Sequence, residues 1–144
     1  MLSAVVDTNV VVAGVLSSNP TSASRALMDR LRAGKFVLLL SPEALLEIEE
    51  VLALSEMKAI HGLTDDEIRM FCESLQVGSR MVSGTTPVSP ALTRDVTDTK
   101  WVAIAVEGDA DYLVTKDRRH LHRLKTVGRT KIVTPRKFLK ALDV

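Results

Sequence analysis

The apolar residues of this chain alternate between short runs typical of buried strands and longer segments typical of helices. The strand-like runs are short and mostly apolar or β-branched, and they lie at residues 4–6, 36–40, 80–82, 111–115 and 131–134. The helical segments lie at residues 21–34, 41–60, 64–78, 98–108 and 135–142. Because parallel strands are joined by crossover helices, this order predicts an α/β fold: a three-layer α/β/α domain with a mostly parallel central sheet of about four to five strands.

Length and composition indicate one soluble domain. A chain of 144 residues is long enough to bury a sizeable core, so we expect a single domain over residues 1–144. No apolar run approaches the roughly 20 residues of a membrane-spanning helix. The single cysteine, Cys72, allows no internal disulfide, and we expect it and Trp101 to be packed in the core. The expected location is the cytoplasm, with no membrane contact.

Two carboxylates lie where predicted strands end. Asp7 directly follows the run at residues 4–6, and Asp117 follows the run at residues 111–115. Ligands of open α/β sheets bind outside the carboxyl ends of the strands, so these two acids can converge if their strands are neighbours. One such Asp alone is often only a turn former or a helix cap. Two at equivalent strand ends indicate a site.

Two further acids lie near predicted helix starts. Asp98 falls in the first turn of its helix, where the helix dipole alone also favours an acid. Glu47 lies one to two turns into its helix, on one margin of the apolar stripe, and Glu49 lies on the other margin. Only a residue on a margin can both touch the core and reach a cleft. Periodicity does not choose between these two glutamates, and either could be solvated surface.

Grouped carboxylates are typical ligands of a divalent metal ion. Their hard oxygen atoms suit Mg²⁺ or Mn²⁺ better than Zn²⁺. Without a cation, neighbouring carboxylates repel one another and raise one another's pKa values. A bound ion can lower the pKa of a water molecule and neutralise charge that develops on a phosphodiester. Such a site would need no nucleophilic Ser or Cys.

Charge is distributed unevenly along the chain although the formal net charge is only +1. The segment from Lys116 to Lys140 is strongly basic, and Asp117 is its only acid. Such a cluster can bind phosphates, although a solvated surface is the alternative. His120 and His122 lie in this basic stretch, and we expect them to be exposed or to face phosphates rather than to bind metal.

Four motifs, in this order, resemble those of the PIN-domain ribonucleases. They are "VVDTNVVVAGVL" at residues 5–16, "SPEALLEIEEVL" at 41–52, "DTKWVAIAVEGDADYLVTKDRRHL" at 98–121 and "KIVTPRKFL" at 131–139. The resemblance spans essentially the whole chain and extends to the small bacterial, VapC-like group of toxins in type II toxin–antitoxin systems. It implies a cytoplasmic endoribonuclease that uses Mg²⁺ or Mn²⁺ to hydrolyse RNA, with an antitoxin protein as partner.

The resemblance also assigns residues to a site. It places the metal-binding and catalytic acids at Asp7, Glu47, Asp98 and Asp117. Asn9 and Thr115 match polar positions that orient those acids. Members of the family often carry a second acid where Thr99 stands, which makes Asp95 a substitute, and commonly carry Gly where Lys116 stands. An acidic cleft alone would repel RNA, so we expect nearby cations to bind its phosphates. These are Arg118, Arg119, Arg123 and Lys125.

Two other functions stay open from the sequence. One is a catalytically inactive PIN-like domain that only binds RNA or protein, which would differ from the ribonuclease in turnover alone. The other is an Asp-dependent phosphotransfer domain of the haloacid-dehalogenase or response-regulator kind. Asn9 weakens the second reading, because a haloacid-dehalogenase phosphatase would prefer Asp at this position.

The predicted helices at residues 41–60 and 64–78 carry more apolar side chains than packing against one small sheet requires. We therefore expect a homodimer that forms through these helices. The residues concerned are Leu52, Leu54, Met57, Ile60, Met70 and Phe71.

Overall fold

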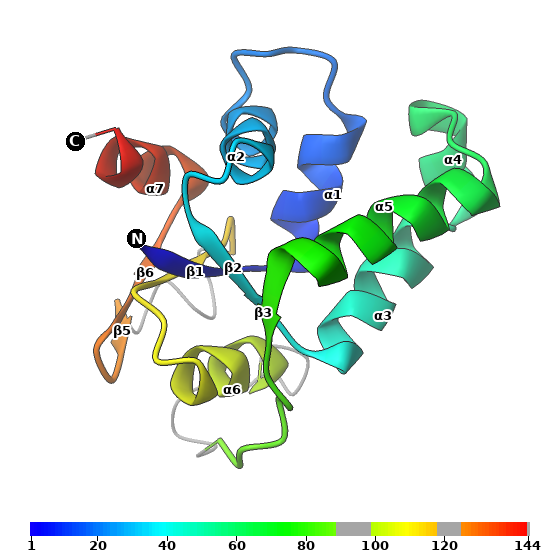
Figure 1. Ribbon diagram of the computed structural model, residues 1–144. Helices are drawn as coiled ribbons and strands as arrows, with labels where there is room; N and C mark the ends of the chain where they lie inside the picture. Colours follow the sequence, from blue (N-terminus) through cyan, green and yellow to red (C-terminus); the bar gives the residue numbers. More distant parts are fainter. Residues whose placement is uncertain (89–98, 118–124, 144) are drawn as a thin grey trace.

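The computed structural model describes residues 1–88, 99–117 and 125–143, and its elements are drawn in Figure 1. The strands are β1 (Ser3–Val6), β2 (Val37–Leu40), β3 (Ser79–Met81), β4 (Tyr112–Val114), β5 (Thr126–Val127) and β6 (Thr130–Val133). The helices are α1 (Thr8–Leu16), α2 (Ala23–Arg32), α3 (Pro42–Leu52), α4 (Ser55–His61), α5 (Asp65–Gly78), α6 (Thr99–Glu107) and α7 (Pro135–Leu142).

The sheet has the strand order β3-β2-β1-β4-β6-β5, and every neighbouring pair is parallel except β5 with β6. The prediction of an α/β fold with a mostly parallel sheet is therefore confirmed. The number of strands differs, since the sheet has six strands rather than four to five. The additional strand is β5, only two residues long, which pairs antiparallel with β6 through a tight turn at Gly128. A strand this short has too few residues to show an alternating pattern.

Helices cover both faces of the sheet (Figure 1): α1, α2 and α7 lie on one side, and α6 lies on the other. This division follows from topology. The chain steps from β1 to β2 to β3 in one direction and then returns to β4 on the far side of β1. Right-handed crossovers in opposite directions place their helices on opposite faces. The connections after β1 and β4 also leave in opposite directions, so the carboxyl ends of these two strands form the ligand-binding crevice expected of such sheets.

Helix α1 was not among the predicted helices. Its sequence is apolar almost throughout, so it lacks the polar face that gives a surface helix its periodicity. The structure explains this, because Val10, Val11 and Val12 are all buried. At Gly14 the helix crosses α2 so closely that a Cβ atom would lie 2.4 Å from Cγ of Met28. The run after Asp7 is therefore a buried helix packed between the sheet and its neighbours.

The single helix predicted over residues 41–60 is two helices. Helix α3 ends at Leu52, and α4 begins at Ser55. The break occurs because Leu54 adopts an extended backbone (φ −60°, ψ 140°) and turns the chain. Leu52 itself is fully buried in the core, so its assignment to an exposed dimer surface is wrong.

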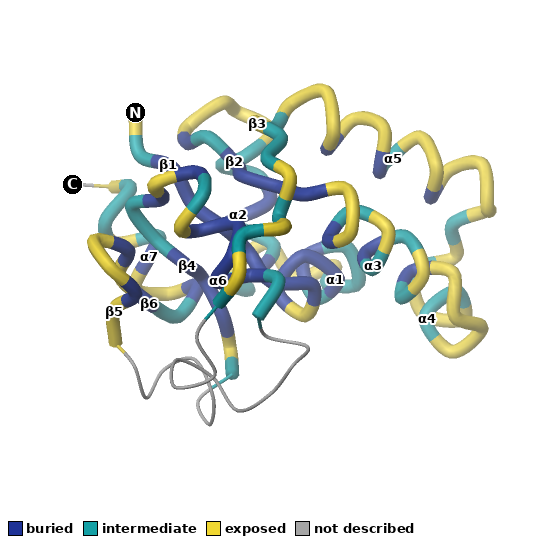
Figure 2. Tube along the Cα trace, turned by 90° about the horizontal axis from the view of Figure 1, so that it is seen from below, coloured by how far each residue is buried: buried dark blue, intermediate teal, exposed yellow. Residues whose placement is uncertain are grey.

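The core lies on both sides of the central strands, which are buried along most of their length (Figure 2). The expectation that Cys72 and Trp101 are packed inside is confirmed, since they are 3% and 4% exposed. On the α7 side, Phe138 packs edge-on against Phe36 with ring centroids 5.0 Å apart. None of the helices within the described residues combines the length and the apolar character that crossing a membrane requires.

Candidate active site

Three of the predicted acids line one cleft of about 200 Å³ at the carboxyl ends of β1 and β4. Asp7 directly follows β1, Asp117 follows β4, and Glu47 reaches the cleft from α3. The remaining lining residues are Thr8, Asn9, Val51 and Trp101. The acids thus come from three elements that are far apart in the sequence, and the sheet topology brings them together.

Asp7 is held in place by backbone and side-chain hydrogen bonds. Its backbone N–H donates to the carbonyl of Val114 at 3.1 Å, which ties the residue to β4. Its Oδ1 accepts from the N–H of Val10 at 3.1 Å and so caps α1, while the Thr115 hydroxyl donates to Oδ2. Thr115 also accepts the backbone N–H of Asp117 at 3.0 Å. Thr115 therefore connects the two strand-end acids, the orienting position that the sequence resemblance gave it.

Asp7 is only 6% exposed, and this burial raises the pKa of its carboxyl group. The charges of Asp117 and Glu47 raise this pKa further. The hydrogen bonds from Thr115 and Val10 act in the opposite direction but do not cancel the effect. A buried carboxylate near two others is costly to ionise. The carboxylate of Asp7 is therefore disfavoured relative to its protonated form.

This shift predicts how metal-free stability depends on pH. A carboxyl whose pKa is raised by folding stabilises the protein fully below its unfolded pKa of about 3.9, and this contribution is lost as pH rises through the folded pKa. In chelator, the free energy of unfolding of Asp7→Asn minus that of the wild type should therefore increase as pH rises above about 4. Urea unfolding of both proteins at several pH values measures this difference, which cancels the titration of other groups. A difference that does not change with pH would contradict the raised pKa.

Glu47 faces the cleft, whereas Glu49 lies on the side of α5, where its charge acts on Cys72. The Thr8 hydroxyl donates to Oε2 of Glu47, and the ammonium group of Lys100 pairs with Oε1. The structure thus resolves the choice between the two helix margins. Both carboxylate oxygens of Glu47 have protein partners, one from α1 and one from α6.

Lys100 was missed by the sequence analysis. A cation in the first turn of a helix is disfavoured by the helix dipole, so its position at the start of α6 was a usable signal of a specific partner. Asn9 is exposed at the cleft, and Lys125 is exposed before β5 and does not line the cleft. The other predicted residues lie outside the described part of the chain. They are Asp95, Asp98, Arg118, Arg119, His120, His122 and Arg123.

The donor atoms at the cleft suit a hard divalent ion. No group of three or more His, Cys, Asp or Glu side chains within the described residues is arranged to hold one ion together. Mg²⁺, however, commonly uses one or two carboxylates and keeps several waters. Asp7 and Asp117 provide such a pair, and Glu47 already has its charge matched by Lys100. These residues therefore fit a hydrated Mg²⁺ or Mn²⁺ ion.

Comparison with protein families finds a match of residues 3–119 to the model described as the PIN domain. The matched part includes all three acids of the cleft and Lys100, and it excludes β5, β6 and α7. A search of the curated proteins finds no match.

Proposed function

This chain belongs to the PIN-domain family, and on that premise we propose that it is an endoribonuclease that hydrolyses RNA with the help of Mg²⁺ or Mn²⁺. PIN domains are generally nucleases. The observation that carries the proposal is the convergence of Asp7 and Asp117 from neighbouring parallel strands on one cleft that Glu47 also lines. An acid-lined site at this edge of the sheet suits phosphodiester hydrolysis.

In this proposal, each residue of the cleft has a defined task. Asp7 and Asp117 would hold the ion, and Thr115 orients Asp7 by hydrogen bonding. The bound ion would supply a water of lowered pKa and neutralise charge that develops on the phosphate oxygens. Glu47, fixed by Thr8 and Lys100, presents a carboxylate to the cleft that can accept a hydrogen bond from a water molecule.

A cleavage assay tests the proposal. A fluorescently labelled, unstructured RNA is incubated with the protein in Mg²⁺, in Mn²⁺ and in chelator, and cleavage is expected only with metal. Asp117→Asn, purified in parallel, should lack this activity and so excludes a contaminating nuclease. Asp65→Asn, at an exposed ion pair with Lys58 outside the cleft, is the matched control and should cleave normally.

An RNA-binding measurement and a phosphodonor labelling experiment separate the alternatives. RNA that is bound but never cut would identify a binding domain without turnover. Stable transfer of an acid-labile phosphoryl label from a small phosphodonor to Asp7 would identify a phosphotransfer domain. The hydrogen bonds to both oxygens of Asp7 and its burial favour a metal ligand over a nucleophile.

RNA binding by the basic segment is the next part of the proposal. Replacing Arg118, Arg119 and Arg123 with Gln should weaken RNA binding, because phosphate binding releases counterions. The slope of log affinity against log salt should flatten by about 0.7 for each phosphate of single-stranded RNA that the variant no longer neutralises. Metal binding at the acids should persist. Fluorescence anisotropy at several salt concentrations measures the slope.

The matched control for this triple variant removes the same charge elsewhere. Arg30, Arg32 and Arg69 lie on α2 and α5 and already pair with acids, so their replacement by Gln should leave the slope unchanged. If the test variant also keeps the wild-type slope, the RNA path lies on another face.

Homodimer formation is a further part of the proposal. Ile60 on α4 and Met70 on α5 are 64% and 65% exposed, and Leu54, just before α4, is 45% exposed. Met57 and Phe71 are half-buried against the core. Figure 2 shows the exposed outer side of these two helices. Light scattering should give the mass of a dimer at micromolar concentration. The double variant Ile60→Glu and Met70→Glu should give a monomer, because a charge in an apolar interface is costly to desolvate.

A wild-type protein that stays monomeric across that concentration range would contradict the dimer.

A role as the toxin of a type II pair, acting in the cytoplasm with an antitoxin protein as partner, completes the proposal. The gene next to the coding sequence tests that role directly, since an antitoxin is encoded beside its toxin.

A further inference from the structure

A second hollow lies beside the acidic cleft, at the same edge of the sheet. It has a volume of about 350 Å³, and the described residues that line this basic hollow are Ala23, Lys116, Thr134, Pro135 and Arg136. Lys116 follows β4 and Thr134 follows β6, whereas the cleft lies at the ends of β1 and β4. In the sheet, β4 is the neighbour of both β1 and β6. Since neighbouring strands are about 5 Å apart, the basic hollow and the cleft are adjacent.

Lys116 connects the two sites along the chain. It lines the basic hollow, while the next residue, Asp117, lines the cleft. The residue before it, Thr115, is fully buried, and its backbone N–H donates to the carbonyl of Val133 at 3.0 Å. This hydrogen bond fixes the chain that leaves β4 against β6. A ligand in the basic hollow would therefore lie next to a ligand held by Asp117.

Arg136 lines the basic hollow from the start of a well-anchored helix. The Thr134 hydroxyl caps α7 by accepting a backbone N–H of the first turn at 3.2 Å, and Pro135 is the first residue of the helix. Phe138, in the same turn, is fully buried in the core. Helix α7 also packs alongside α2 (Figure 1). The position of the Arg136 backbone is therefore set by the fold.

The charges of the basic hollow have no acidic counterpart within the described residues. Neither Lys116 nor Arg136 forms an ion pair with a described residue, whereas Arg30, Arg32 and Arg129 each pair with an aspartate. No acid is among the described residues that line the hollow. Arg136 also lies in the first turn of α7, where the helix dipole disfavours a positive charge. Two such cations around one hollow indicate an anionic ligand.

The donors of the basic hollow suit a phosphate group. The guanidinium group of Arg136 has a planar fork of N–H donors that matches two phosphate oxygens, and the ammonium group of Lys116 adds a compact positive charge. The backbone N–H of Arg136 belongs to the first turn of α7, where such groups have no carbonyl partner inside the helix. The helix end alone would not identify a site, but it strengthens the attraction that the two side chains provide.

We propose that Lys116 and Arg136 bind a backbone phosphate of the RNA strand, next to the phosphodiester that is cleaved. This inference rests on the proposed function, because that function brings the scissile phosphodiester to the cleft. It adds a phosphate subsite, and one of its two cations, Arg136, lies beyond the residues 3–119 that match the family. A strand held at this subsite has its neighbouring phosphodiester positioned at the acids, which favours reaction by proximity.

Fluorescence anisotropy with a labelled, unstructured RNA in chelator tests the subsite without cleavage. The double variant Lys116→Gln and Arg136→Gln should bind RNA at least about tenfold more weakly than the wild type, because charge-assisted hydrogen bonds are lost. The slope of log affinity against log salt should flatten by about 0.7, the value for one phosphate of single-stranded RNA. RNAs with a 5′-phosphate and with a 5′-hydroxyl should show the same loss, as expected for a backbone phosphate.

Neutral phosphate linkages locate the subsite along the strand. In a series of RNAs, each internal phosphate in turn is replaced by an uncharged methylphosphonate, and single-turnover cleavage in Mg²⁺ is measured below saturation. The wild type should cut at least about tenfold more slowly when the neutral linkage is at one phosphate next to the cut. The double variant should show no further loss at this position, because the cations that would bind the phosphate are already absent.

The matched control removes two positive charges at the opposite edge of the sheet. Lys35 and Lys131 are exposed and lie at the amino ends of β2 and β6. Their joint replacement by Gln should leave the affinity for RNA and the salt slope unchanged. The double variant of Lys116 and Arg136 should melt no lower than the wild type, since neither residue pairs with a described acid and the dipole disfavours Arg136. This melt excludes misfolding as the cause of weaker binding.

The outcomes separate this inference from the proposed function. If the double variant keeps the wild-type affinity and slope, or stays as sensitive as the wild type to the neutral linkage, the subsite is wrong while metal-dependent cleavage stands. A loss seen only with 5′-phosphorylated RNA would also overturn the inference, because the hollow would then bind a terminal phosphate. If RNA binding depends on both cations but no RNA is cut, the phosphate site stands and the proposed hydrolysis fails. If the wild type binds no RNA, both proposals fail.

Discussion

Asp7→Asn is expected to lower the rate of RNA cleavage by at least about a thousandfold while the protein stays folded. The substitution removes a negative charge that would hold the metal ion, and a metal ion contributes several kcal/mol of charge stabilisation in the transition state. Each tenfold of rate corresponds to about 1.4 kcal/mol, so a loss of this size follows from the ligand alone. Cleavage of labelled RNA under single-turnover conditions measures the effect.

The Asp7→Asn substitution should retain the hydrogen bond that caps α1. An Asn side chain keeps one carbonyl oxygen, which can still accept from Val10 and cap α1, since Asn is as good a cap as Asp. In chelator at neutral pH, Asp7→Asn should be at least as stable as the wild type, because a buried carboxylate that repels its neighbours has gone. Clear destabilisation in metal-free thermal melts would mean that the acids do not repel one another.

Asp7→Ala separates the structural role of this residue from its charge. The alanine variant loses the cap of α1 and leaves the hydroxyl of Thr115 without its acceptor. Its free energy of unfolding should fall below that of Asp7→Asn by about 1 kcal/mol or more. Equal stability of the two variants would contradict the capping role. Both should lack cleavage.

The sequence predicted that Asp7 and Asp117 lie at the same edge of the sheet, and it left open whether their strands are neighbours. Short apolar runs separated by helices imply parallel strands, and the carboxyl ends of parallel strands lie at one edge of a sheet. The structure places β1 beside β4, with Val6 opposite Val114 in the register, so the acids that follow these strands are neighbours. No detail of side-chain packing was needed for that step.

The roles of Glu47 and Lys100 could not be predicted from topology and helix periodicity. Helical periodicity is symmetric about the apolar stripe, so it distinguishes buried from exposed positions but not one margin from the other. The choice of Glu47 over Glu49 depends on where α1 and α6 pack against α3, which the sequence of α3 does not contain. Lys100 was overlooked, although a cation at a helix start is unusual.

Helix α1 was missed for a different reason. Helix prediction from periodicity needs a polar face, and a helix that is covered by α2, α3 and α4 has little of one. The same run of valines is equally typical of a buried strand. From the sequence, a helix cap was the alternative to a ligand role for Asp7, and the structure shows that Asp7 does cap α1. One residue therefore carries a structural and a proposed functional role at once.

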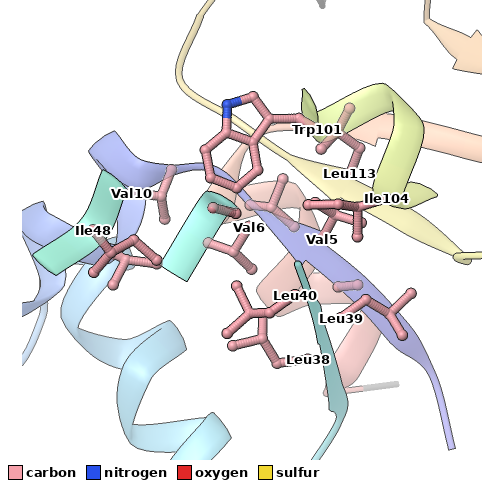
Figure 3. Close-up of a cluster of buried hydrophobic side chains, with 14 of the residues drawn as sticks. Val5, Val6, Val10, Leu38, Leu39, Leu40, Ile48, Trp101, Ile104 and Leu113 are labelled. Atoms are coloured by element: carbon pink, nitrogen blue, oxygen red, sulfur yellow. The ribbon is translucent and has the colours of Figure 1, made fainter. Parts of the chain in front are cut away.

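Trp101 connects the core to the cleft, and its removal should have the largest effect on stability. The indole is 4% exposed, belongs to the same buried cluster as Val6 and Val10 (Figure 3), and lines the cleft. Replacing a buried Trp with Ala costs about 3–5 kcal/mol through lost transfer energy and the cavity that remains. For a domain whose total stability is about 5–15 kcal/mol, this is a large share. Trp101→Phe should cost clearly less because it leaves a smaller cavity.

Urea unfolding followed by far-UV circular dichroism measures this loss, since Trp101 is the only tryptophan and fluorescence disappears with it. Val77→Ala, at a side chain that is 88% exposed, is the apolar control and should change stability by less than about 0.5 kcal/mol. Trp101→Ala should also slow cleavage by at least about tenfold at temperatures where it remains folded, because the start of α6 then no longer fixes Lys100 beside Glu47. A loss of stability below about 1 kcal/mol would show that the indole is not part of the packed core. Full activity in the folded variant would show that the position of α6 does not matter to the cleft.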